Sequence, residues 1–521
     1  MEHVQTRWNG WGLPGHEDPL ALNEPAWRWL AQAFAMPALL ATPPRDLSGI
    51  TLPPSRLSAK AREKLVAQLG GYGVQQDDFS RASHASGRGL TDLLRLRAGD
   101  LSAAPDAVLF PRNEAEVLAA LRLCAEMDIA VMPLGGGTGA VAPLRGGHSA
   151  VITLSMADLN RLTSVDTVSG VAEAEAGITG PELERQLKAR GMMLGHRPDA
   201  FEFSTLGGWI AQPGGGQEAA RYGEVPDWLQ GLRVATPQGL MTPQGMPDLN
   251  QLMVGSQGAF GVITAASIRI RALPAREEQR LYLFPDFASG LAAIREAWRI
   301  GVPHAFLRLS DDGETRFLRA LEQAGEDWDL ARHLFDVYLS VRRFDSSAAR
   351  LLAGFAGSES DIKTARKTFD GLAKRLGALR LGVDARWPKE RFSTGYRRDT
   401  LLDRGAAMDS LVLSANWSKL PSLYVAVRTA LKQAMRSYAP RAGAHGLVLC
   451  HVSAANPEGA TLTFTWLFPR ILDGGIAQAQ SIRQAALAAA QPQQGRTLER
   501  DVLRGIKQTL DPSGILNPGI L

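Results

Sequence analysis

Residues 133–139, Pro-Leu-Gly-Gly-Gly-Thr-Gly, form the segment of this chain best suited to hold a ligand. An apolar run at residues 129–132 predicts a buried strand, which opens into three successive glycines, Thr138 and Gly139. Glycine lacks a Cβ, so its backbone can adopt positive φ and approach a ligand closely. Several successive N–H groups can then point into one concavity and bind a diphosphate. Taken alone, the segment fits a purely structural turn equally well.

The glycine loop differs from two common nucleotide-binding patterns. A Rossmann fingerprint requires G-x-G-x-x-G at the start of a helix, with an acidic residue about 20 residues later. Residues 142–149 are instead rich in glycine and proline and cannot open a long helix. No P-loop lysine follows the glycines. The loop therefore predicts a diphosphate bound by backbone amides in a different fold.

Length and charge limit the classes of protein that this chain can represent. At 521 residues it exceeds the usual size of one domain, so two or more domains are expected. The net charge of +4 is small, and the basic residues form no stripe, so no nucleic-acid partner is expected. A modestly basic surface suits a small anionic or lipid-like substrate, or an anionic membrane surface. Peripheral membrane association and a homodimer both stay open.

The cysteine content argues against disulfides and metal. Cys124 and Cys450 are the only cysteines, and they lie far apart in apolar surroundings. A disulfide framework and a cysteine-based metal site are excluded, and no metal is expected. Two buried thiols fit a reducing cytoplasmic location. The first 20 residues show no secretory pattern and no run of 18 apolar residues occurs, so the chain is expected to be soluble or at most peripheral.

Strands and helices alternate beyond residue 105, which is typical of an α/β unit. A helix is expected at residues 117–127, and a second from Thr179, a suitable N-cap, to residue 190, with Pro181 in its first turn. Strands are expected at residues 129–132, 150–154, 170–176, 232–236 and 262–270.

A second region begins near Pro274. A strand at residues 282–287 leads into a helix at residues 290–299, and a strand-helix pair is expected at residues 335–341 and 363–376. Further strands are expected at residues 410–414, 446–454 and 462–468, the last with the two-residue period of a half-buried strand.

Several segments occur in an order that identifies a family. They are the glycine loop, DAFEFSTLGG at residues 199–208, YG at 222–223, GSQGAFGVIT at 255–264 and the terminal LDP…NPG. This order resembles the FAD-linked oxidases of the vanillyl-alcohol-oxidase type, which carry a PCMH-type FAD-binding domain. RWNGWG at residues 7–12, AGITG at 176–180 and FSTLGGW at 203–209 look like segments of alkylglycerone-phosphate synthase. The likeness covers nearly the whole chain and is weakest between about residues 279 and 390.

The resemblance implies an α+β fold. It comprises a PCMH-type two-part FAD-binding domain, an antiparallel-sheet cap domain and a C-terminal helical segment. The expected parts are an N-terminal helical arm at residues 1–100, the FAD-binding domain at 101–275, the cap or substrate domain at 276–480, and a C-terminal segment at 481–521 that returns to the FAD domain.

The resemblance also implies FAD as the cofactor, with its diphosphate on the glycine loop. Covalent attachment needs a nucleophile such as His or Cys at the flavin; the loop contains neither, so non-covalent FAD is expected. The expected FAD-binding residues are Pro133, Leu134, Gly135, Gly136, Gly137, Thr138, Gly139, His196, Asp199, Ser204, Thr205, Gly207, Gly208, Gln212, Gly215, Gln257, Gly258, Gly261, Val262 and Ile263.

Two chemical parts of alkylglycerone-phosphate synthase are missing. That family joins a fatty alcohol to an acylated dihydroxyacetone phosphate on FAD, without net redox change and with a tyrosine as acid/base. Asn456 stands at the matching position, and an amide cannot exchange a proton near neutral pH. The family's run of histidines corresponds to residues 489–495, which contain none.

Arg398 and His451 are the catalytic candidates. Arg398 matches a family arginine that contacts the substrate phosphate, and a guanidinium suits phosphate or carboxylate; a surface or ion-paired arginine is the equal alternative. His451 lies on an expected cap strand and could replace the missing acid/base, although a structural hydrogen-bonding histidine is commoner.

Three functions stay open. The first is an FAD-binding oxidoreductase, a dehydrogenase or oxidase, acting on a hydroxy acid, alcohol or phosphorylated polyol. Arg398 would hold the anionic end and His451 would take the hydroxyl proton. The second is an alkylglycerone-phosphate-synthase-like transferase of ether-lipid synthesis, and the third a catalytically inert FAD-binding homologue. The missing tyrosine and histidines favour the first and third.

Overall fold

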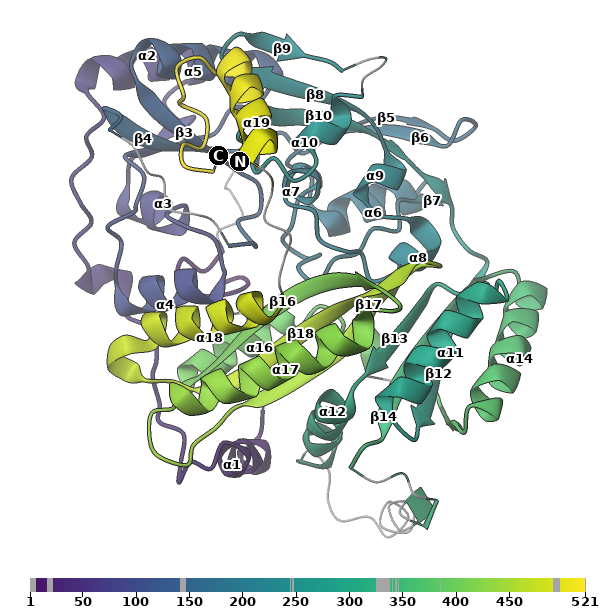
Figure 1. Cartoon of the computed structure of the whole chain (residues 1–521). Helices are drawn as coiled ribbons and strands as arrows, with labels where there is room; N and C mark the ends of the chain where they lie inside the picture. The colour runs from purple at the N-terminus through teal and green to yellow at the C-terminus, as the bar shows by residue number, and fades with distance from the viewer. Residues whose placement is uncertain are drawn as a thin grey trace.

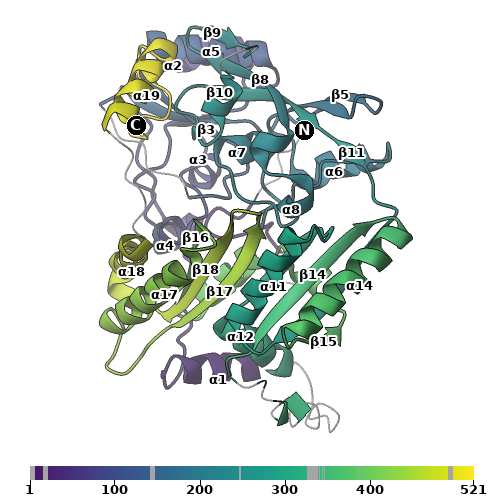
Figure 2. The ribbon, with the colours of Figure 1, turned by 45° about the vertical axis from the view of Figure 1, so that its right-hand side comes forward.

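Three large sheets organise the chain, as the computed structural model shows (Figure 1). The structure describes every residue except 1–5, 16–21, 141–146, 244, 246–247, 325–337, 340, 343, 345, 385, 491–496 and 521. The two smaller sheets lie together in one half of the molecule and the seven-stranded sheet lies in the other (Figure 2).

The four-stranded sheet carries the glycine loop. Its strands in spatial order are β1 (Val74–Gln75), β2 (Ala107–Leu109), β4 (Ala150–Ser155) and β3 (Ile129–Leu134). Strands β2, β4 and β3 run parallel, and α5 (Glu114–Glu126) provides the crossover between β2 and β3. Helix α2 (Ala59–Leu69) packs on α5. Helices and the five-stranded sheet cover β3 on both faces. Its residues are therefore apolar throughout and do not alternate between apolar and polar. The expected strands at residues 129–132 and 150–154 and the helix at 117–127 are confirmed.

The five-stranded sheet is antiparallel. Its strands in spatial order are β5 (Leu162–Asp166), β6 (Val171–Glu175), β10 (Val262–Arg269), β8 (Leu229–Thr236) and β9 (Gly239–Met241). Helices α6 (Gly180–Lys188) and α7 (Leu206–Ala211) share its apolar core. The strands expected at residues 170–176, 232–236 and 262–270 are confirmed as β6, β8 and β10. Thr179 is the N-cap of α6 and Pro181 lies in its first turn, as predicted, but the Thr179 side chain makes no capping hydrogen bond.

The C-terminal segment returns to the four-stranded sheet. After α19 (Thr497–Leu510), the Val131 N–H donates to the carbonyl of Ile515, and the Asn517 N–H donates to that of Val131, both at 2.8 Å. The Asp511 side chain holds this turn, since it accepts the Leu516 N–H at 2.8 Å. The chain therefore adds a strand-like stretch beside β3, at the mouth of the glycine loop.

The seven-stranded sheet is antiparallel throughout. Its strands in spatial order are β15 (Leu379–Gly382), β12 (Arg276–Phe284), β14 (Ala349–Gly357), β13 (Phe306–Ser310), β17 (Leu447–Ala455), β18 (Gly459–Pro469) and β16 (Ala406–Asn416). One face packs on α11 (Phe287–Arg299), α14 (Glu359–Arg375), α17 (Leu420–Ser437) and α18 (Gly475–Ala490) (Figure 1). The other face meets α1 (Glu24–Ala33), α12 (Asp312–Ala324) and α16 (Thr394–Asp403).

The prediction of a strand at residues 335–341 is wrong for the residues of this stretch that the structure describes. Tyr338 and Leu339 are helical, while residues 335–337 and 340 lie outside the described part of the chain. A short apolar run fits the 3.6-residue period of a helix and the two-residue period of a strand equally well, and the described residues here are helical. Strands β13, β14 and β15 and helix α12 were not predicted.

The first hundred residues contact both halves of the molecule. Helix α2 packs on α5 in the half that carries the glycine loop, whereas α1 packs on α12, and α4 (Leu90–Ala98) packs on α18 and β16, all beside the seven-stranded sheet. Trp8 and Trp11 are buried. The predicted domain boundaries stay a prediction. Among the described helices, none has the length and apolar character that crossing a bilayer would need.

Candidate active site

The glycine loop opens into a cavity of about 360 Å3 between the two smaller sheets, here called the glycine-loop cavity. Three segments far apart in sequence meet there: the loop itself, residues 198–214 and residues 257–263, with Asn517 and Ile520 of the returning C-terminal segment. The predicted residues that line it are Pro133, Leu134, Gly135, Gly136, Gly137, Thr138, Gly139, Ser204, Thr205, Gly207, Gly208, Gln212, Gln257, Gly258, Gly261, Val262 and Ile263.

Close backbone packing explains the glycines of the loop. A Cβ on Gly135 would lie 2.3 Å from Thr205 Oγ1, and one on Gly136 only 1.8 Å from the Phe203 carbonyl oxygen. Gly137 has φ +63°, which a side chain would strain. The described residues that line the cavity include no charged side chain, histidine or cysteine. A diphosphate bound there would therefore rest on backbone N–H groups.

Three predicted cofactor residues lie elsewhere. His196 is buried between the Trp209 and Trp228 rings, at centroid distances of 5.0 and 5.3 Å, and burial lowers its pKa to about 4. Neither of its ring nitrogens has a hydrogen-bond partner among the described residues. Asp199 lines a second cavity, and Gly215 lines neither.

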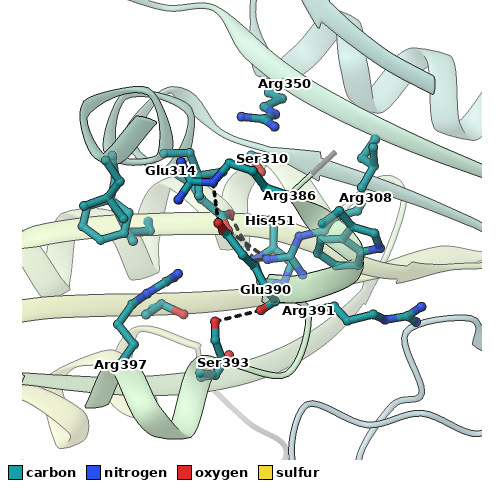
Figure 3. A pocket seen from close by; sticks show the side chains of 18 of the residues that line it. Arg308, Ser310, Glu314, Arg350, Arg386, Glu390, Arg391, Ser393, Arg397 and His451 are labelled. Carbon is teal, nitrogen blue, oxygen red and sulfur yellow. Dashed lines mark hydrogen bonds and ion pairs between the residues drawn. The ribbon is translucent and has the colours of Figure 1, made fainter. Parts of the chain in front are cut away.

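This second cavity, here called the sheet cavity, lies against the face of the seven-stranded sheet that α12 and α16 cover (Figure 3). The two cavities are neighbours, because Pro198 and Ala200 line the first and Asp199, between them, lines the second. Side chains from adjacent strands meet in its wall: in the sheet register Ser310 pairs with both Arg350 and His451. Residues of β17 alternate between the two faces, which turns His451 toward the cavity and Cys450 toward the core.

His451 forms the centre of a charged group in the sheet cavity. Its Nδ1 lies 3.0 Å from Glu314 Oε2, and Arg308 Nη2 lies 2.9 Å from Glu314 Oε1 and 3.1 Å from the same Nδ1 (Figure 3). Burial alone would raise the pKa of Glu314. The attraction of His451 and Arg308, together with their hydrogen bonds, outweighs it and lowers the pKa to about 2. Glu314 is therefore ionised and accepts hydrogen bonds; in the tautomer whose Nδ1 donates to it, Nε2 is the nitrogen that keeps the lone pair.

The start of α12 explains why Glu314 reaches His451. Asp311 is the residue before the helix, and its Oδ1 accepts the N–H of Glu314 at 2.8 Å and that of Cys450 at 3.1 Å. The Asp311 N–H in turn donates to the Cys450 carbonyl at 2.7 Å. The Tyr424 hydroxyl donates to Asp311 Oδ2 at 2.9 Å. Asp311 thus fastens the first turn of α12 to β17, next to His451.

Arginines and carboxylates surround this centre. Arg350 pairs with Glu322 at 2.6 Å and with Asp384. Arg391 Nη2 donates to Glu218 at 3.2 Å. The remaining charged groups in the wall are Arg386, which pairs with Glu390, and Arg397, whose guanidinium lies 5.9 Å from the Phe317 ring centroid.

The predicted anion-binding residue, Arg398, lines neither cavity. Its Nη1 donates to the carbonyl of Arg88 at 2.8 Å, and burial lowers its pKa. Its neighbour Arg397 lines the sheet cavity instead. Asn456 lies in the turn between β17 and β18, where its Oδ1 accepts the N–H groups of Glu458 at 2.9 Å and Gly459 at 2.8 Å. Of the stretch matching the family histidines, residues 491–495 lie outside the described residues.

Sequence reasoning missed Glu314 and Arg308. One signal was present, since an aspartate followed three residues later by a glutamate, Asp311 to Glu314, is a helix-start pattern. This pattern predicts the start of α12. The contact between Glu314 and His451 cannot be predicted from it, because that contact also requires the pairing of β13 with β17.

Two known protein families match most of this chain. Residues 105–242 match the family described as FAD binding domain, and residues 273–471 and 492–521 match the family described as FAD linked oxidases, C-terminal domain. The chain belongs to the FAD-linked oxidases. It is an FAD-dependent enzyme, as expected, with the PCMH-type fold. The glycine-loop cavity fits FAD, because its glycines expose backbone amides, and at Gly135, Gly136 and Gly139 a Cβ would collide with neighbouring residues.

The relatives of this FAD-linked oxidase chain fall into two groups. Alkyldihydroxyacetonephosphate synthase is another name for alkylglycerone-phosphate synthase. The enzyme from Trypanosoma brucei brucei is 26% identical over 99% of this chain and 92% of its own length. A solved alkyldihydroxyacetonephosphate synthase superposes with a TM-score of 0.86 at 26% identity, covering 99% of both chains. The D-2-hydroxyglutarate dehydrogenase of Bos taurus is 32% identical, but over only 43% of each chain. p-Cresol methylhydroxylase shares the fold, with a TM-score of 0.63 at 14% identity.

Proposed function

We propose that this FAD-linked oxidase is a dehydrogenase or oxidase that removes a hydride from a carbon bearing a hydroxyl group in a small anionic substrate. The observation that carries the proposal is the Glu314–His451 pair, which leaves His451 Nε2 as a base in a cavity next to the FAD site. A carboxylate on Nδ1 stabilises the imidazolium that forms when Nε2 takes a proton.

In the proposed reaction, bound FAD supplies the hydride acceptor. His451 Nε2 takes the hydroxyl proton, the C–H electron pair leaves with the hydride, and a C=O bond forms. Glu314 keeps the imidazole oriented, and Arg308, whose Nη2 also lies 3.1 Å from His451 Nδ1, neutralises the carboxylate at Oε1. Arg397 and Arg391 line the same cavity and would bind the anionic end of the substrate. Arg398, which contacts the Arg88 carbonyl, stays a predicted substrate contact.

The size of the sheet cavity supports a small substrate. Its volume of about 130 Å3 is below the roughly 300–1,000 Å3 of sites for drug-sized ligands. A hydroxy acid or a phosphorylated polyol is the substrate class that this volume and the arginines favour. Non-covalent attachment is proposed for FAD, since the described lining residues offer no histidine or cysteine. We propose a cytoplasmic location; peripheral membrane association and a homodimer remain open proposals.

An alkyldihydroxyacetonephosphate synthase activity is the second candidate, because that likeness extends over 99% of the chain. Against it stand Asn456 and the histidine-free stretch. A spectroscopic experiment separates the two. The purified protein is mixed anaerobically with hydroxy acids, alcohols and polyol phosphates, and the visible flavin absorption is followed. Bleaching by one class supports the dehydrogenase or oxidase. An oxidised flavin with every compound, together with an ether product from a fatty alcohol and acylated dihydroxyacetone phosphate, would establish the transferase instead.

A further inference from the structure

The RWNGWG segment, residues 7–12, is fitted closely to helix α16. A Cβ on Gly12, which has φ +83°, would lie 2.8 Å from the Tyr396 ring, and one on Gly395 would lie 2.2 Å from the Trp11 ring. Asp399 of α16 accepts the Trp11 N–H at 3.3 Å and pairs with the Arg7 guanidinium. The segment is therefore built into the fold at a fixed position on the helix that carries Arg397 and Arg398.

Arg88 fixes the segment from the other side. The residue is only 6% exposed. Its Nε donates to the carbonyl of Gly10 at 3.0 Å and its Nη2 to that of Arg7 at 2.9 Å. Its Nη1 donates to the carbonyls of Ser86 at 3.1 Å and Gly87 at 3.2 Å. Burial lowers the pKa of Arg88 to about 10, so the guanidinium stays charged at neutral pH.

The backbone of Arg88 faces the cofactor site. Its N–H donates to the carbonyl of Gly139, the last glycine of the loop, at 2.8 Å. Its own carbonyl accepts from Arg398 Nη1 at 2.8 Å. One residue thus joins three parts of the molecule: the RWNGWG segment through its side chain, and the glycine loop and α16 through its backbone.

We propose that Arg88 is a positioning residue through which the RWNGWG segment sets the affinity for FAD. A run of glycines has many accessible backbone conformations, so aiming its N–H groups at a diphosphate requires an external anchor. The hydrogen bond from Arg88 to Gly139 is that anchor at the far end of the loop, and the side chain holds it in place. The proposal rests on FAD binding alone and is independent of the reaction proposed above.

The test compares two buried arginines in the full-length chain. Arg81 is the control: it is 5% exposed, and its guanidinium likewise donates to backbone carbonyls, those of Pro105 and Pro53, both at 2.7 Å. Apoprotein of Arg88→Met and of Arg81→Met is titrated with FAD, and binding is read from flavin fluorescence; the melting temperature of each apoprotein is also measured. We expect FAD binding to weaken about tenfold in Arg88→Met and to change less than about twofold in Arg81→Met. Both variants should melt at lower temperature than the wild type.

A second variant acts on the proposed connection without changing Arg88. A Cβ on Gly10 would lie 2.6 Å from Arg7 Cζ and 2.7 Å from Asp399 Oδ2, so Gly10→Ala disturbs the Arg7–Asp399 ion pair that fixes the segment to α16, outside the cofactor site. It should also weaken FAD binding, and the double variant with Arg88→Met should lose little more than Arg88→Met alone. Wild-type FAD affinity in Arg88→Met or in Gly10→Ala would overturn the proposal. An equal loss in Arg81→Met, or additive losses in the double variant, would also overturn it.

Discussion

Replacing Glu314 by glutamine tests the proposed reaction most directly. The change keeps the shape of the side chain and removes the charge that faces His451 at 3.0 Å. At that distance and an effective dielectric constant of about 20, an imidazolium and a carboxylate attract by about 5–6 kcal/mol. Most of this attraction offsets the free-energy cost of desolvating the two groups. The net contribution of a hydrogen bond to a charged group is ~1.5–3 kcal/mol.

In the proposed reaction the imidazolium forms as the proton is transferred, so the loss of its stabilisation falls on kcat rather than on KM. We expect kcat of Glu314→Gln to fall about 10- to 150-fold, since each 1.36 kcal/mol is a factor of ten. Arg308 would reinforce the effect, because its Nη2, 3.1 Å from His451 Nδ1, would then repel the imidazolium with no carboxylate charge to offset it.

The assay is the anaerobic rate of flavin bleaching at saturating substrate, measured by stopped flow. Glu322→Gln is the matched control, because Glu322 lines the same cavity but pairs with Arg350. Its bleaching rate should stay within about threefold of the wild type. If Glu314→Gln bleached the flavin as fast as the wild type, His451 would not be the base that Glu314 assists.

The remaining predictions concern cofactor, substrate and stability. Gly136→Val should yield protein without flavin, because its Cβ would meet the Phe203 carbonyl oxygen at 1.8 Å; flavin retention in the absorption spectrum would contradict the loop assignment. Arg397→Ala should raise KM for the anionic substrate at least about tenfold, and by more than Arg398→Ala does, since only the former lines the sheet cavity; the opposite order in steady-state kinetics would favour Arg398. His196 has a folded pKa of about 4, below the unfolded 6.5, so its contribution to stability is complete above pH 6.5 and is lost as pH falls toward 4. Between pH 7.5 and 5 the wild type should lose about 2 kcal/mol more unfolding free energy in urea than His196→Phe, and equal losses would refute the burial argument.

The cofactor site could be predicted from the sequence because its signal is local. Positions such as Gly136 and Gly207 tolerate only glycine, since a Cβ would meet a neighbouring backbone or side chain at 1.8 and 2.7 Å. A restriction of that kind appears in the sequence as a short, unusual pattern. The two-residue period of β18 was likewise visible, because one face of the strand is core and the other is not.

The sheet cavity could be predicted only in part, because its chemistry depends on strand pairing. His451 was found, but its partners come from β13 and α12, in the region where the family likeness is weakest. Placing Arg308 beside His451 requires the pairing of Ser310 with His451, which no local pattern specifies. His196 was also predicted at the cofactor, but its place between two tryptophan rings depends on tertiary packing that no local pattern shows.

The return of the C-terminal segment decides when the lining of the glycine-loop cavity is complete. The lining of the glycine-loop cavity runs from Met132 to Ile520, and the whole seven-stranded sheet is encoded between those residues. On the ribosome, the loop therefore emerges long before Asn517, whose N–H bonds the Val131 carbonyl. Pairings between such distant residues close late in folding, because the intervening chain must be ordered first. The complete FAD cavity therefore forms only once synthesis has passed the seven-stranded sheet and reached Ile520.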